Sequence, residues 1–245
     1  MDLRQLILIA LTALWFGISS WVALPAAAMA ESLTHAHHHI PEDPTVPAVF
    51  PFNTEAEDFF NKGLDCLYVN DYEGAVDAFS QSLSLASGYR VYLQRGQVYA
   101  QLGRWTQAIT DYTQALNISA VDDFHAHFLR GMAFEAIGEF EAAIADYTDT
   151  INIYPTDGIG YARRGIVYSQ LGQILPAHRD FEAALKQNAG RPEAYLGRGN
   201  LRLKLGNPIG AMRDYQTAVT LFTEQGHPTD AQAIARQIEQ LEAQS

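Results

Sequence analysis

The feature that most constrains the fold of this chain is a sequence pattern that repeats about every 34 residues. Five glycines mark the pattern, with separations of 33, 35, 34 and 34 residues, at Gly63, Gly96, Gly131, Gly165 and Gly199. Seven residues after each of them lies a turn residue, at Asn70, Gly103, Gly138, Gly172 and Gly206. An alanine follows at twelve residues, and at sixteen comes an aromatic residue, at Phe79, Tyr112, Tyr147, Phe181 and Tyr215. A fixed period of this length is typical of repeat architectures, in which stacked units share a core.

Each unit is expected to contain two helices joined by a short turn, because apolar residues recur at helical spacing on both sides of the turn residue. In the second unit they are Tyr92, Leu93, Gly96, Tyr99 and Ala100 before the turn, and Trp105, Ala108, Ile109, Tyr112 and Ala115 after it. The small residues let the two helices approach closely, and the aromatic residues are expected to fill the space between units. No unit can bury its apolar face alone, so stability is expected to come from stacking.

The pattern resembles the tetratricopeptide repeat family. Two units, YRVYLQRGQVYAQLGRWTQAITDYTQALNISAV and FHAHFLRGMAFEAIGEFEAAIADYTDTINIYPTD, carry its aromatic, small, tyrosine and alanine residues at the expected places. The resemblance implies an all-α fold, a right-handed α-solenoid of five helix-turn-helix units over residues 54–225. The unit boundaries are expected at about 56–88, 89–123, 124–157, 158–191 and 192–225. The first unit departs from the pattern at Cys66, where the others have an aromatic residue or Arg202, and only the third closes with proline, Pro155.

Residues 226–245 are predicted to form a capping helix. Ile234, Ile238 and Leu241 share one face and charged residues lie elsewhere, as expected of a helix that ends a solenoid and keeps it soluble. Thr229 and Gln232 are predicted to form a capping box. Within the last unit, Asn207 followed by proline predicts another helix start.

Residues 1–30 are predicted to be a signal peptide or an N-terminal membrane anchor. Between Arg4 and Glu31 there is no charged residue, and Ala28-Met29-Ala30 fits a cleavage site of small residues. The apolar stretch is long for a signal peptide and just long enough to span a bilayer, and a buried helix of the folded domain is the remaining alternative. Both leading interpretations predict an exported protein of bacterial or cyanobacterial type, in the periplasm or thylakoid lumen, or anchored in the membrane and facing that side.

Residues 31–53 are predicted to be a flexible linker, because four prolines exclude a stable helix there. The segment also carries a histidine cluster, at His35, His37, His38 and His39. Imidazole clusters bind Zn, Cu or Ni, so an extracytoplasmic metal-binding protein is the alternative function. Because a flexible linker loses entropy on binding and no second histidine group completes a rigid site, a solvated linker is preferred. No metal and no other cofactor is expected.

The net charge of -12, from 28 acidic and 16 basic residues, disfavours nucleic acid as a partner. A single cysteine excludes an intrachain disulfide and a CxxC site, and Cys66 is expected to be an inert packing residue. The chain has no GxSxG, HExxH or phosphate-binding glycine loop, so we expect no enzyme activity.

Arginine precedes the marker glycine in units two to five, and each of these units has an aspartate before its second-helix aromatic residue. The pairs are Arg95 with Asp111, Arg130 with Asp146, Arg164 with Asp180, and Arg198 with Asp214. The first unit has neither member. This joint presence and absence predicts a bidentate arginine-carboxylate contact that fixes the geometry of the unit. A basic stripe for an acidic partner is the alternative.

The family resemblance also implies a groove for another protein or peptide, lined by the second, fifth, ninth, twelfth and thirteenth places of each unit. These places hold Phe60, Leu64, Tyr68, Arg90, Leu93, Gln97, Gln101, His125, Phe128, Met132, Glu135, Ile159, Ala162, Ile166, Gln170, Glu193, Leu196, Asn200 and Lys204. The set is largely apolar and suits a peptide with hydrophobic anchors, although several members are equally explained as interior packing. The family's carboxylate clamp is not expected, because Phe60 and Leu64 replace its lysine and asparagine. The expected role is a protein-binding scaffold in assembly of an envelope or membrane complex, with membrane association through the N-terminal segment.

Overall fold

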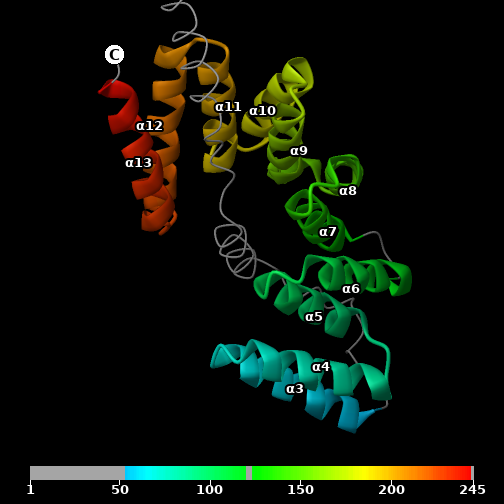
Figure 1. Ribbon diagram of the computed structural model, residues 1–245. Helices are drawn as coiled ribbons and strands as arrows, with labels where there is room; N and C mark the ends of the chain where they lie inside the picture. Colours follow the sequence, from blue (N-terminus) through cyan, green and yellow to red (C-terminus); the bar gives the residue numbers. More distant parts are fainter. Residues whose placement is uncertain (1–52, 120–122, 244–245) are drawn as a thin grey trace, which may run out of the picture. The chain divides into compact units, whose positions relative to one another are not determined.

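The computed structural model describes residues 53–119 and 123–243, and these form α-helices joined by short turns (Figure 1). The helices pair as α3 (Thr54–Tyr68) with α4 (Tyr72–Leu85), α5 (Tyr89–Gln101) with α6 (Trp105–Ile118), α7 (Phe124–Ala136) with α8 (Phe140–Ile153), α9 (Ile159–Gln170) with α10 (Ile174–Gln187), and α11 (Pro192–Lys204) with α12 (Pro208–Glu224). A 3-10 turn, η2 (Pro155–Asp157), precedes α9, and α13 (Pro228–Glu242) follows the last pair. The described residues contain no strand, which confirms the predicted all-α class. The predicted N-terminal signal or anchor and linker residues 31–52 lie outside the described residues.

The helices stack in chain order. Each helix packs against the one that follows it, and α5 also meets α7 as α9 meets α11, so first helices of neighbouring units touch. Contacts restricted to neighbouring units define a solenoid, as the sequence period predicts. We use the name first-helix face for the residues at the five predicted groove places on each of α3, α5, α7, α9 and α11.

The second-helix aromatic residues lie inside their own units, where each ring covers the marker glycine. A Cβ atom on Gly96 would stand 2.7 Å from the ring of Tyr112, and one on Gly131 would stand 2.9 Å from the ring of Tyr147. Both rings are fully buried. The absence of a Cβ therefore lets the ring close the gap between the two helices of one unit.

The rings also pack between units, as expected. A Cβ on Gly197 of unit five would clash with the ring of Phe181 in unit four. Phe79 shares a buried cluster with Val91 and Val98 of the next unit.

The turn inside each unit requires a left-handed backbone, with φ between 71° and 79° at the glycines of units two to five. Asn70 takes the same conformation in the first unit, with φ of 58°, because asparagine tolerates this region better than other side chains. This explains the single exception to glycine at that place.

We expect Asn70→Val to lower the free energy of unfolding by about 1–2 kcal/mol, because a β-branched residue is strained at positive φ. Asn70→Gly is the matched control and should change stability by only a few tenths of a kcal/mol, roughly neutral. Chemical denaturation followed by circular dichroism measures both. Equal stability of the two variants would contradict the role of this conformation.

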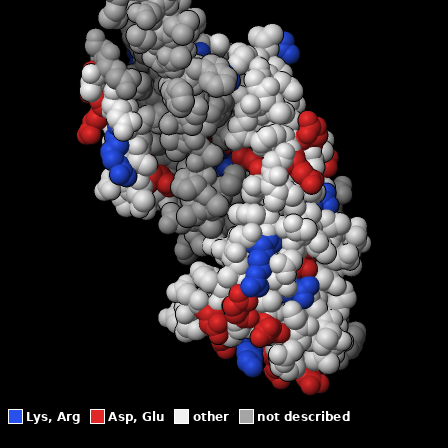
Figure 2. Space-filling model, viewed as in Figure 1, with Lys and Arg blue, Asp and Glu red and all other residues white. Residues whose placement is uncertain are grey.

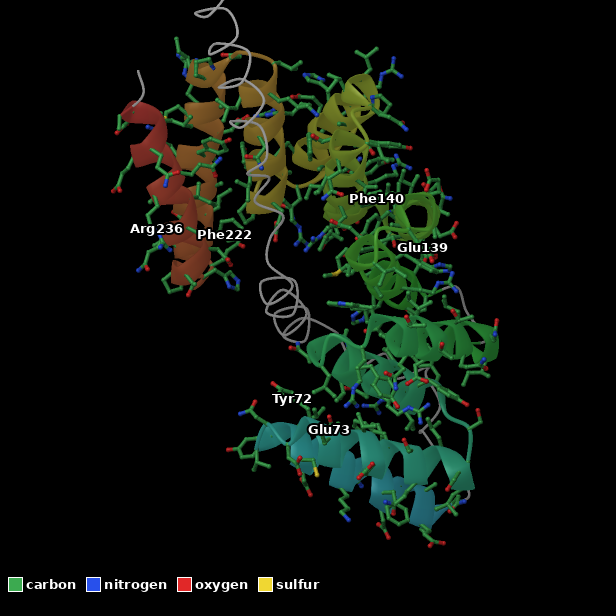
Figure 3. The ribbon with its side chains drawn as sticks, viewed as in Figure 1. Tyr72, Glu73, Glu139, Phe140, Phe222 and Arg236 are labelled. Atoms are coloured by element: carbon green, nitrogen blue, oxygen red, sulfur yellow. The ribbon has the colours of Figure 1, made fainter. Side chains whose placement is uncertain are left out.

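The C-terminal helix α13 packs on α12 and closes the stack. Phe222 of α12 (labelled in Figure 3) forms a buried cluster with Ala231 and Ile234 of α13, and Ile238 and Leu241 pack against the cluster. The capping box predicted for Thr229 is wrong, because the helix begins at Pro228 and His227 is its N-cap. Proline lacks an N–H and has a helical φ, so it occupies the first helical position and places Thr229 inside the first turn.

The start predicted at Asn207 is confirmed, since its Oδ1 accepts a hydrogen bond of 2.9 Å from the Gly210 N–H. The Cys66 side chain is partly buried and packs against the core of the first unit, which matches its expected packing role.

Candidate functional site

The predicted groove residues divide into buried and accessible sets. Eight are only 1–9% exposed: Phe60, Leu93, Gln97, His125, Phe128, Met132, Glu135 and Ala162. Gln101, Ile159 and Ile166 are half-buried, and Leu64, Tyr68, Arg90 and Asn200 are exposed. The histidine cluster in the predicted linker, at positions 35 and 37–39, lies outside the described residues.

The aromatic members of the buried set contact the ring of their own unit's second helix. The ring centroids of Phe60 and Phe79 are 5.6 Å apart, and those of Phe128 and Tyr147 are 6.0 Å apart. Such tilted pairs stabilise a core. Phe60 and Phe128 therefore contribute to the packing of their units, and the side chains that a ligand can reach without disturbing that packing are the half-buried and exposed members.

Several polar atoms on the first-helix face are buried without a hydrogen-bond partner. They are both amide atoms of Gln97, Oε1 of Gln170 and Oε2 of Glu193. The contrast with unit five is informative, because there Asn200 at the place of Gln97 accepts a hydrogen bond of 2.8 Å from the Tyr215 hydroxyl. In unit two, the Tyr112 hydroxyl and the Gln97 amide are both buried without a partner. Buried polar groups are nearly always hydrogen-bonded in native proteins, so these exceptions require an explanation.

A buried ionic group lies on α7, α8 and α9. The Tyr147 hydroxyl donates a hydrogen bond of 2.7 Å to Oε2 of Glu135. Burial raises the pKa of Glu135, although Arg163 and this hydrogen bond oppose the rise. Burial by itself lowers the pKa of Arg163, but Glu135, Tyr147 and Glu193 together raise it, so the guanidinium stays charged. Arg163 is not among the residues predicted from the sequence to have a role. The available signal was the doubled arginine in unit four, since the paired Arg164 comes directly after it.

The four predicted arginine-aspartate pairs are all present and all bidentate. In each, arginine Nε and Nη2 donate to the two carboxylate oxygens, at distances of 2.7–3.1 Å. Nη1 of each arginine donates to a side chain of the preceding unit, namely Ser80, Thr113, Thr148 or Glu182. The pairs therefore fix both the geometry within a unit and its register on the unit before it. The third contact was not predicted, and its signal is the Ser, Thr or Glu seventeen residues after the marker glycine in units one to four.

Aromatic rings flank these guanidinium groups. The Arg95 guanidinium lies 5.9 and 5.7 Å from the ring centroids of Tyr92 and Tyr99, and Arg164 has the same arrangement with Tyr161 and Tyr168. Cation–π contacts of this kind add to the ion pairs. Because each guanidinium is already engaged by a carboxylate, the pairs support the structural interpretation of the arginine pattern.

The pKa values of the paired aspartates differ between units. Burial raises the pKa of Asp111, and its pairing with Arg95 only partly offsets the rise. Burial acts in the same direction on Asp146, but hydrogen bonds from Arg130 and His127 outweigh it and lower the pKa of Asp146. The difference follows from the second partner, because His127 stands where the other three paired units have tyrosine.

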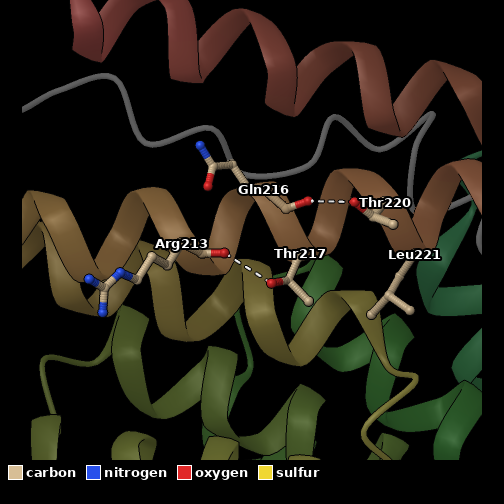
Figure 4. Close-up of a pocket in the computed structure, with 5 residues that line it drawn as sticks. All are labelled: Arg213, Gln216, Thr217, Thr220 and Leu221. Carbon is tan, nitrogen blue, oxygen red and sulfur yellow. Dashed lines mark hydrogen bonds between the residues drawn. The ribbon is translucent and has the colours of Figure 1, made fainter.

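A shallow hollow on α12 has a volume of about 440 Å³ and is lined by Arg213, Gln216, Thr217, Thr220 and Leu221 (Figure 4). The hydroxyl groups of Thr217 and Thr220 donate to backbone carbonyls one turn earlier, as the dashed lines in Figure 4 show. These side chains include no nucleophile activated by a neighbouring base, so the hollow offers no chemistry typical of an active site.

Charge is distributed in small groups on the visible surface. In Figure 2, basic side chains lie in separate groups beside acidic ones. Glu73, at the start of α4 (Figure 3), pairs with Arg104 at 2.6 Å, and both side chains are well exposed. None of the helices described here is long and apolar enough to cross a membrane.

Two sequence profiles of tetratricopeptide repeats match residues 89–156 and 163–225, which together make up more than half of the chain. The chain belongs to the tetratricopeptide repeat family. Comparison with curated protein sequences finds no match. The match to the repeat profiles and the helix pairs confirm the predicted family, and repeats of this family serve as scaffolds for protein interactions.

Solved structures of low sequence identity share the fold. MamA from Desulfovibrio magneticus superimposes with a TM-score of 0.63 at 17% identity, covering 71% of this chain and 98% of that chain. A tetratricopeptide repeat protein from Parabacteroides merdae gives 0.61 at 21% identity, covering 77% and 80%. YrrB, described as having an unusual peptide-binding site, gives 0.56 at 18% identity, covering 83% and 99%. At these identities the likeness concerns the fold alone.

Proposed function

We propose that this tetratricopeptide repeat protein is a non-catalytic scaffold that binds a segment of another protein along its first-helix face. The segment is extended or amphipathic, and the setting is the assembly of an envelope or membrane complex. The scaffold role follows from membership of the tetratricopeptide repeat family. The ligand class and the setting are the proposal.

The observation that carries the proposal is the set of buried polar atoms without hydrogen-bond partners at Gln97, Gln170 and Glu193. An unpaired polar group in a folded protein costs about 1–3 kcal/mol, so their retention in three different units favours a role in binding. Amide and carboxylate groups are suited to the N–H and C=O groups of a peptide backbone. A bound segment would satisfy these atoms, which is why a peptide is a better ligand than an apolar surface.

Exposed apolar side chains at the same places supply anchors for the segment. Tyr68 is 90% exposed and Leu64 is 36% exposed at the end of α3, next to Val69 at 68%. Apolar anchors combined with unpaired polar atoms match the way in which helical grooves recognise peptides. The peptide-binding site named for YrrB gives a precedent on the same fold.

We further propose that the protein acts outside the cytoplasm, in a periplasm or thylakoid lumen. The support is the uncharged segment before Glu31 and its small residues at positions 28–30. N-terminal sequencing of the protein purified from its source tests this. A mature chain that starts at Glu31 is expected, and an intact N-terminus on a protein found only in the cytoplasm would contradict it.

The binding proposal predicts opposite effects of Gln97→Leu on stability and on binding. Leucine removes two unpaired buried polar atoms, so the free energy of unfolding should rise by about 1 kcal/mol. The same change should weaken capture of partner proteins by about fivefold or more, the equivalent of roughly one lost hydrogen bond. Denaturation measures the first, and quantitative mass spectrometry of proteins captured from a source extract measures the second.

Gln114→Leu is the matched control, because Gln114 is exposed on the second helix of the same unit. It should leave capture unchanged. If neither variant changes the capture of partner proteins, the assignment of the first-helix face is contradicted. If both variants lose capture, nonspecific aggregation is indicated.

A further inference from the structure

His127, Asp146 and Asp149 form a compact cluster between α7 and α8. Nδ1 of His127 lies 3.1 Å from Oδ1 of Asp146 and 3.6 Å from Oδ2 of Asp149. The three ligand atoms all lie within 4.8 Å of one another. Asp146 and Asp149 are three residues apart on one helix, so their side chains share a face, and His127 approaches them from the facing helix.

Unit three differs from the other paired units at both outer positions of this cluster. Where it has His127, the others have tyrosine, at Tyr92, Tyr161 and Tyr195. Where it has Asp149, the others have Gln114, Ala183 and Thr217. The aspartate between them is common to all four units as the partner of arginine. Two departures from the repeat pattern therefore meet in space, at residues that lie 22 positions apart in the sequence. The packing of the repeat does not require either one.

We infer that His127, Asp146 and Asp149 form a binding site for a divalent transition metal, with Zn²⁺ as the expected ion. One imidazole nitrogen and two carboxylate oxygens are a common three-ligand set for zinc. Zinc bonds of about 2.0–2.2 Å at tetrahedral angles place the ligand atoms about 3.4 Å apart, between the two distances from His127 Nδ1. Asp149 is half-exposed and can close the remaining gap by rotating its side chain, and water can take the fourth position.

Arg130 orients the site while competing with the ion for the carboxylate. Its Nε and Nη2 donate to both oxygens of Asp146 at 2.8 and 2.7 Å, which fixes the carboxylate plane. A carboxylate has about four lone-pair positions, so Oδ1 can accept this bond and still face the ion. In the bound state, the ion replaces the hydrogen between His127 and Asp146. With two carboxylates and one guanidinium, the cluster keeps one net negative charge for the cation. The nearby guanidinium repels the cation and should weaken the site.

The experiment uses the full chain with His35, His37, His38 and His39 changed to serine, which removes the histidine cluster of the predicted linker. Titration with Zn²⁺ against a chromophoric chelator should show one saturable site. His127→Tyr combined with Asp149→Gln should weaken it at least about tenfold. Both replacements are the residues of unit two, so the fold should tolerate them, and circular dichroism checks this.

His178→Gln is the matched control, because His178 is exposed on α10 and belongs to no such cluster among the described residues. It should leave Zn²⁺ binding unchanged. Two outcomes would overturn the inference: no saturable Zn²⁺ binding below about 1 mM, or binding that the double substitution at 127 and 149 leaves intact.

Discussion

Gly131→Leu should lower the free energy of unfolding by about 3 kcal/mol, at the upper end of the cost of over-packing. The reason is a steric clash inside the unit. Even a Cβ at this position would lie 2.9 Å from the Tyr147 ring, which is fully buried and cannot move outward. A leucine side chain must therefore separate α7 from α8. Because unit three lies in the middle of the stack, its distortion should also uncouple the units on either side.

Chemical denaturation followed by circular dichroism measures the effect, and a second unfolding transition would report the uncoupling. Ala145→Leu is the matched control, since it adds bulk at an exposed position of α8 in the same unit. It should change stability by less than about 0.5 kcal/mol. If the two variants are equally stable, the close contact between glycine and ring is not what holds the two helices together.

The fold could be predicted from the sequence because its determinants recur at a fixed spacing within each unit. The marker glycine, the turn residue and the second-helix ring all act over less than twenty residues, so one unit confirms the next. The arginine-aspartate pairs were predictable for the same reason. The first unit lacks both the arginine at the place of Arg95 and the aspartate at the place of Asp111. Five copies of one pattern act as an internal alignment.

Properties that the repeat pattern does not encode were less predictable. Groove places imply a direction for a side chain and not its exposure, so Phe128 at 5% and Tyr68 at 90% belong to the same predicted set. The cluster around His127 was missed because His127 and Asp149 depart from the repeat pattern, and only the pairing of α7 with α8 brings them together. The N-cap of α13 was predicted at Thr229 but lies at His227, because proline at the first helical position outweighed a possible capping box.

Arg95→Met should lower the free energy of unfolding by about 3 kcal/mol at neutral pH, because it leaves the carboxylate of Asp111 buried without its charge partner. The Asp111 side chain is only 3% exposed, and Arg95 supplies both of its hydrogen bonds, each of 2.8 Å. The lost contacts of Arg95 with Ser80 and the two flanking tyrosines add to the effect. Arg104→Met is the matched control, since it removes an exposed ion pair with Glu73 and should cost at most about 1 kcal/mol.

The pH dependence of the same variant distinguishes an unpaired charge from lost packing. Burial already raises the pKa of Asp111, and without Arg95 nothing in the pair offsets that rise. A carboxyl with a raised folded-state pKa binds its proton more tightly in the folded protein than in the unfolded chain. The electrostatic penalty is therefore fully present above the folded-state pKa, and it disappears as the pH falls toward the unfolded value of about 3.9. The stability gap between Arg95→Met and the parent protein should accordingly narrow as the pH falls through the raised folded-state pKa of Asp111 toward the unfolded value of about 3.9. Adding Asp111→Leu should close much of the gap at neutral pH, because a buried pair replaced by apolar residues costs little. A gap that is independent of pH and is not reduced in the double variant would assign the role of Arg95 to packing rather than to charge.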